Sequence, residues 1–134
     1  MTTSHLWGEL PEVKDIRTPS MLLNVQASAL QEMTSGALTC TLNRVDRSDG
    51  QIESHLRLIA PSLGNYSVVL VVILHQVLSY PCGIFSPFLG GGLVTCQNEA
   101  GLETSLRDIL QHEKTRQLIT NLLNQIKAEN SIAA

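Results

Sequence analysis

The longest uninterrupted apolar run in the chain is Val68 to Leu74, which contains no polar residue. Successive side chains of a β-strand point to opposite faces of the sheet, so a strand without polar residues is expected to have both faces buried. The run is far shorter than the ~20 apolar residues that a membrane-spanning helix requires. The pattern therefore predicts an inner strand over about 66–76 and no membrane span.

Alternating apolar and polar residues on both sides of this run predict further strands. The alternation covers 38–43 and 52–60, and a cluster of turn-forming residues separates the two segments. Shorter strands are expected at 82–85 and 93–96, joined by a loop over 86–92. Strands connected by short turns pair in the antiparallel sense. The sequence thus predicts an antiparallel sheet of four to five strands.

Helical spacing of apolar residues appears before and after the strands. Thr18 suits a helix N-cap and Pro19 suits the first helical position, which predicts a helix over 19–34. In the C-terminal third, two apolar stripes predict helices over 101–111 and 114–129, with one bent helix as the alternative.

This order of elements predicts an α+β fold. It would consist of an N-terminal helix, the sheet, and two C-terminal helices packed on one sheet face. The domain is expected to span 18–130, after an N-terminal arm over 1–17 and before a tail over 131–134.

The apolar strand raises the question of what covers its second face. We expect the helices to cover Val68, Leu70, Val72 and Leu74. The far face would then carry Val69, Val71 and Ile73, each forgoing roughly 1.5–3 kcal/mol if exposed. The arm with Trp7, a strongly curled sheet, a second copy of the chain or another protein could cover them. Exposed apolar patches of this kind often mark interaction sites.

Composition narrows the class of partner. The chain has 134 residues, which suits one domain, and charged residues make up 16%, below the usual ~25%. Fewer charges favour a buried self-interface. The net charge of −3 lacks the basic field of a nucleic-acid binder, so we expect no nucleic-acid partner.

The cysteine and histidine residues show no spacing typical of a metal site or a disulfide framework. A Cys–His nucleophilic pair of Cys82 and His75 stays open, because its members need be neighbours only in space. Cys40 and Cys96 are expected to be small core residues. The glycines 90–92 lack the Gly-Lys-Ser/Thr ending of a phosphate loop. We therefore expect no catalytic residue, no metal and no cofactor.

A polar row on the second strand is the best candidate for a polar contact surface. Glu53, His55 and Arg57 alternate along that strand and should share one face. They could form an acid–base and anion-binding row. The simpler interpretation is a solvated face whose charges compensate one another.

Three stretches carry a resemblance to a known group of proteins. They are Thr18-Pro19 followed by Gln26-Ala27, Leu30 and Thr34-x-Gly36; Ala60-Pro61-x-Leu63-x-Asn65-Tyr66; and Glu113-Lys114-Thr115 followed by Ile119 and Leu122-Leu123. Together they resemble a family of small uncharacterised bacterial proteins over about residues 18–126. The resemblance implies a bacterial cytoplasmic protein and carries no activity, cofactor or site residue.

These observations favour a non-enzymatic protein-interaction module of the immunity, antitoxin or adaptor type, which dimerises or docks through a sheet face. The candidate partner-binding residues are Val69, Val71, Ile73, Glu53, His55, Arg57 and Trp7. The alternatives are a small-ligand binder or enzyme with a pocket between sheet and helices, and a structural subunit of a larger assembly. The N-terminus lacks the basic and apolar regions of a signal peptide, so we expect a cytoplasmic location.

Overall fold

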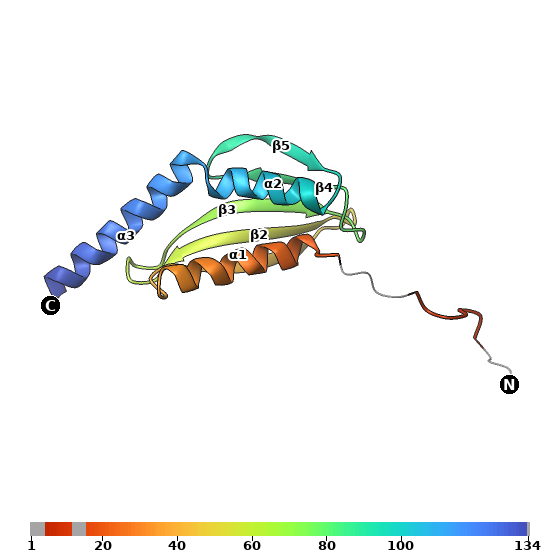
Figure 1. Ribbon diagram of the computed structural model, residues 1–134, viewed down its shortest axis with the longest axis horizontal. Helices are drawn as coiled ribbons and strands as arrows, with labels where there is room; N and C mark the ends of the chain where they lie inside the picture. Colours follow the sequence, from red (N-terminus) through yellow and green to blue (C-terminus); the bar gives the residue numbers. More distant parts are fainter. Residues whose placement is uncertain (1–4, 12–15, 134) are drawn as a thin grey trace.

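A computed structural model of the chain describes residues 5–11 and 16–133. The predicted α+β fold is confirmed: an N-terminal helix precedes a five-stranded antiparallel sheet, and two helices follow it (Figure 1). The elements are α1 (Pro19–Met33), β1 (Thr39–Asp46), β2 (Ile52–Ala60), β3 (Tyr66–His75), β4 (Cys82–Ser86), β5 (Gly90–Cys96), α2 (Glu99–Leu110) and α3 (Glu113–Ala133).

The sheet is a simple meander with the order β1-β2-β3-β4-β5, and every neighbouring pair is antiparallel. The predicted loop over 86–92 is wrong in its second half, because β5 begins at Gly90. Gly90 and Gly91 have φ angles of +78° and +88°, a conformation that residues with a Cβ atom rarely adopt. The glycines therefore let the chain leave the tight turn and pair with β4 at once.

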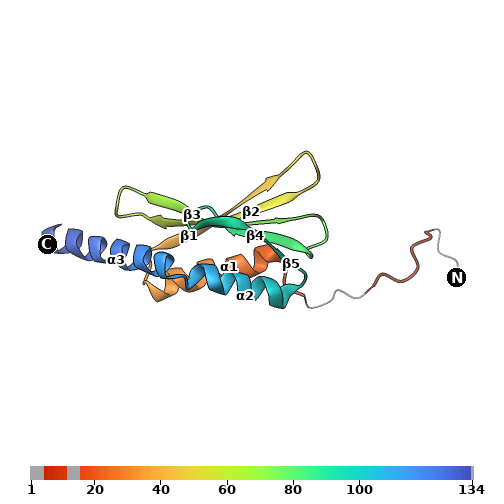
Figure 2. The same cartoon turned by 90° about the horizontal axis from the view of Figure 1, so that it is seen from above.

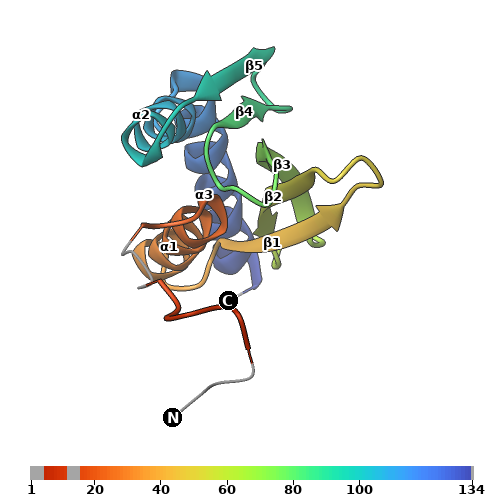
Figure 3. The same ribbon diagram turned by 90° about the vertical axis from the view of Figure 1, so that its right-hand side faces the viewer.

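Side-chain caps set the starts of the first two helices. The Thr18 hydroxyl accepts a hydrogen bond from the Met21 amide at 3.3 Å, and Pro19 follows it as predicted. Asn98 caps α2 by accepting a bond from the Gly101 amide at 2.8 Å. Helix α1 packs on β1 and β2, and α2 packs on β3, β4 and β5. Figures 2 and 3 show both helices side by side on one face of the sheet, and no helix formed by residues 5–11 or 16–133 lies on the other face.

The C-terminal third forms two helices rather than one bent helix. Thr115 is fully buried at the junction, and its hydroxyl donates a hydrogen bond to the Ile109 carbonyl oxygen at 2.8 Å. Helix α3 then diverges from the line of α2 (Figure 1) and continues to Ala133, rather than ending near residue 129. Its residues Leu122 and Ile126 are buried in the core, whereas Ile132 is 79% exposed. No helix in the described part of the chain is long and apolar enough to cross a membrane.

The core lies between the helices and the sheet. It draws on every strand except β1 and on all three helices, and its members are Leu22, Leu23, Ala27, Leu38, Leu56, Leu58, Ala60, Leu70, Val71, Ile73, Cys82, Ile84, Cys96, Leu102, Leu106, Leu122 and Ile126. Strand β1 contributes the partly buried Cys40 and Leu42 at the edge of this cluster.

The described part of the N-terminal arm leads away from the domain (Figure 1). Leu6, Trp7 and Leu10 are 100%, 81% and 79% exposed, so this part of the arm does not cover the sheet. The arm joins the domain at Arg17, whose amide donates to the Glu99 carboxylate at 2.7 Å. The other residues of the predicted arm, 1–4 and 12–15, and residue 134 of the predicted tail lie outside the described residues.

Candidate functional site: the open sheet face

A β-bulge in β3 decides which of its side chains reach the sheet face opposite the helices, called here the open face. Leu56 of β2 lies opposite Val71, but Arg57 lies opposite Val69, so Leu70 is an extra residue in β3. At such a bulge two consecutive residues oppose one partner, and the side-chain alternation is reset. Leu70 and Val71 accordingly both lie in the core on the helix side.

The bulge corrects the predicted composition of the open face. Val71 and Ile73 were expected on that face, but both are fully buried in the core. They pair with Leu56 and Ser54, whose side chains are also buried. Of the predicted trio, only Val69 faces away from the helices, because it pairs with Arg57 before the bulge.

Val72 and Leu74 were assigned to the helix side, and this assignment is wrong for the same reason. They pair with His55 and Glu53, which belong to the polar set of β2, so they lie on the open face. Val72 is only 5% exposed although none of the described helices covers it, because His55 and Phe85 flank it on the neighbouring strands.

Two residues from β4 and β5 extend this apolar surface. Phe85 pairs with Val72 and so shares its face. Leu93 lies over Gly83: a Cβ atom added to this glycine would come within 2.8 Å of the Leu93 Cδ1 atom. Gly83 thus makes room for Leu93, which is 55% exposed. We call the resulting surface the apolar patch; it consists of Val69, Val72, Leu74, Phe85 and Leu93.

The predicted polar row does share one face, beside the apolar patch. The Glu53 carboxylate lies 3.0 Å from His55 Nε2, and its other oxygen accepts a bond from Arg47 at 3.2 Å. Arg57 donates a hydrogen bond to the Ser67 hydroxyl at 3.2 Å. Within residues 5–11 and 16–133, no carboxylate lies within ion-pair distance of Arg57. The row therefore has at one end the Glu53 carboxylate, which is already paired with Arg47, and at the other end the Arg57 guanidinium, which has no carboxylate partner among the described residues.

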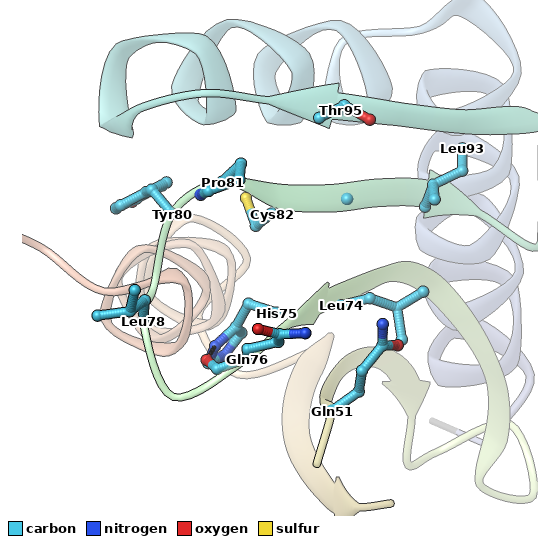
Figure 4. A pocket seen from close by; sticks show the side chains of 11 residues that line it. Gln51, Leu74, His75, Gln76, Leu78, Tyr80, Pro81, Cys82, Leu93 and Thr95 are labelled. Atoms are coloured by element: carbon cyan, nitrogen blue, oxygen red, sulfur yellow. Dashed lines mark hydrogen bonds between the residues drawn. The ribbon is translucent and has the colours of Figure 1, made fainter. Parts of the chain in front are cut away.

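Sequence reasoning left open a nucleophilic pair of Cys82 and His75. Both line a pocket of about 380 Å³ at one end of the sheet, where Figure 4 shows them well separated. Burial, and the neighbouring Cys96, raise the pKa of Cys82 to about 12, so its thiol stays protonated at neutral pH. His75 Nδ1 lies 2.6 Å from the Gln76 carbonyl oxygen, and its Nε2 atom is buried with no hydrogen-bond partner in the described part of the chain. The arrangement provides no activated nucleophile.

Among the described residues, no group of three or more His, Cys, Asp or Glu side chains could hold a metal ion. Trp7, the remaining candidate residue, lies on the arm and not on the open face.

Comparison of the chain with protein-family models, curated proteins and solved structures found no match. The resemblance to small bacterial proteins therefore stays a prediction, and the function must be inferred from the surfaces themselves.

Proposed function

We propose that this chain is a non-enzymatic protein-interaction module that binds through the apolar patch and the adjoining polar row. The observation that carries the proposal is the apolar patch itself, which lies on a sheet face that no helix in the described part of the chain covers. An antiparallel sheet with one face in water normally carries polar residues there. Leu93 is 55% exposed, Val69, Leu74 and Phe85 are partly exposed, and Val72 is buried beneath them. An apolar surface that is rimmed by polar residues is typical of a protein-binding site. The three free thiols fit a reducing compartment such as the cytoplasm.

A second copy of the chain is the partner that the charges favour. Glu53 and Arg57 lie at the two ends of the polar row, with His55 midway between them. A two-fold axis near His55 would place Glu53 of each copy opposite Arg57 of the other, and would supply the carboxylate that Arg57 lacks. The same axis would stack the two apolar patches, as in the aligned packing of two sheets about 10 Å apart.

The first test is a lysine in the apolar patch. Wild-type protein should sediment as a dimer, and Val69→Lys should sediment as a monomer, because burying an unpaired ammonium costs several kcal/mol. Val25→Lys is the matched control, since Val25 is 47% exposed on α1, away from the sheet. Circular dichroism should show that both variants are folded. A monomeric wild type, or a Val69→Lys protein that still dimerises, would contradict the proposal of self-association.

The charge pattern can be tested in the same measurement. Arg57→Glu should weaken the dimer, because like charges then face each other across the axis. Adding Glu53→Arg to that variant inverts the row and should restore association. A double variant that is as weak as Arg57→Glu alone would exclude this two-fold arrangement.

A further inference from the structure

A cavity of about 420 Å³ lies on the helix side of the sheet, away from the apolar patch. It is enclosed by α1, α3 and the strands β1 to β3. Its floor is formed by Cys40, Leu56 and Leu70. Burial raises the pKa of the Cys40 thiol to about 11, so the floor is uncharged at neutral pH.

The walls of the cavity are apolar as well. Leu30 and Met33 line it from the C-terminal half of α1, and Ile119 and Leu123 line it from α3. The space exists because α3 diverges from α2 after residue 111 instead of packing along α1 (Figure 1). The size lies in the range of ~300–1,000 Å³ that is usual for small-molecule sites.

Polar side chains line the cavity where α2 ends and α3 begins. Gln111 and Arg116 come from this junction, and Gln26 comes from the facing part of α1. In the described part of the chain, no carboxylate forms an ion pair with Arg116. Glu113, one turn earlier in α3, does not line the cavity, and its carboxylate accepts a bond from Gln117 at 3.4 Å. An apolar space therefore has one cation and two amides at its edge.

We propose that this cavity binds a medium-chain fatty carboxylate. Its alkyl chain would lie against the apolar floor and walls, and its carboxylate would accept hydrogen bonds from the Arg116 guanidinium and the nearby amides. The planar guanidinium matches a carboxylate with two parallel hydrogen bonds, which an alcohol cannot reproduce. This site does not depend on the dimer proposed above, because the sheet separates it from the apolar patch.

Calorimetric titration with decanoate tests the head group. One decanoate should bind per wild-type chain, and decanol should bind about tenfold more weakly, as expected for loss of a charge-assisted hydrogen bond. Arg116→Gln should weaken decanoate binding by about the same factor and leave decanol unchanged. Lys114→Gln is the matched control, because Lys114 is an exposed cation on the same helix that does not line the cavity. No decanoate binding, or equal effects of the two variants, would overturn the proposal.

A variant whose cavity is filled by a larger side chain tests whether the alkyl chain of the ligand lies in the cavity. Ala29→Phe introduces a phenyl ring at a lining position of α1 and should abolish binding, whereas Ala128→Phe on the exposed side of α3 should not. Decanoate binding that survives Ala29→Phe in a folded protein would place the ligand elsewhere. Should Ala29→Phe not fold, the surface variant Arg116→Gln decides the question.

One competing occupant is the N-terminal arm, and the single tryptophan, Trp7, reports on it. A blue-shifted Trp7 emission that decanoate moves to the red would show that the arm fills the cavity and would overturn the proposal. An emission typical of a hydrated indole, unchanged by decanoate, is the expected result. All titrations should give the same affinity in the Val69→Lys variant, so failure of the dimer proposal and failure of this one are distinguishable.

Discussion

At the scale of single residues, burial makes the cysteine thiols unreactive, although the sequence alone allowed Cys82 to be a nucleophile. Cys82 and Cys96 lie opposite each other on β4 and β5, and each is 3% exposed. The thiolate is the reactive form of cysteine, and burial raises the pKa values of Cys82 to about 12 and of Cys40 to about 11. The thiols of Cys40 and Cys82 therefore act as small apolar groups, as free cysteines in protein cores usually do.

This predicts slow thiol chemistry in the folded protein. At about pH 8, a thiol-specific disulfide reagent should react slowly with the native chain and rapidly with all three cysteines after unfolding in denaturant. Fast native labelling of Cys82, located by mass spectrometry, would contradict the burial on which the prediction rests.

The same shifts predict loss of stability at alkaline pH. The folded-state pKa values of Cys40 and Cys82 lie above the ordinary value of 9.0, so the folded state holds these protons more tightly. Their contribution is complete below pH 9.0 and is lost as the pH rises through about 11 and 12. Urea midpoints should fall over this window, and they should fall less steeply in Cys82→Ala. An equal slope in that variant would assign the loss to other groups.

At the scale of elements, the limits of sequence reasoning are clearest in β2 and β3. The polar row of β2 alternates with buried residues, so its faces could be predicted, and the structure confirms them. Strand β3 is apolar at every position from Val68 to Leu74, so its pattern carries no information about which residue faces which side. The bulge at Leu70 could therefore not be predicted from the sequence. As a result, each residue from Val71 to Leu74 was assigned to the wrong face of the sheet.

A pair of lysine variants tests this register. Val71→Lys should unfold the protein, because it places an unpaired charge in the core at a position with no exposed surface. Val69→Lys, two residues earlier, should stay folded, because its side chain is on the open face. Thermal unfolding followed by circular dichroism distinguishes them. A cooperative transition near the wild-type temperature for Val71→Lys would mean that β3 has no bulge at Leu70.

At the scale of the whole molecule, the two sides of the sheet differ. The helix side holds the core and the cavity, and the open face carries the apolar patch, through which we propose that a second copy binds. The order and type of the elements followed from the sequence, because period and capping residues are local. A pocket between sheet and helices was an alternative in the sequence analysis, but its lining residues could not be predicted. They depend on the angle at which α3 leaves α2, and no local pattern encodes that angle.

The arm provides a prediction at this scale. A chain that begins at residue 16 should keep its stability within about 0.5 kcal/mol, because Leu6, Trp7 and Leu10 are exposed. Arg17, which such a chain retains, is fixed by the Glu99 carboxylate and by the Tyr80 hydroxyl, which donates to its carbonyl oxygen at 2.8 Å. Denaturant unfolding measures the difference. A loss of several kcal/mol would mean that the arm packs on the domain.

The extra residue in β3 also has a consequence for comparing this chain with others. A relative that lacks the bulge would be one residue shorter in the middle of its most hydrophobic strand. An alignment that avoids gaps inside strands would then match core positions of one protein to surface positions of the other from Val71 onward. The gap belongs at Leu70, and placing it there is the condition for recognising an equivalent open face in another sequence.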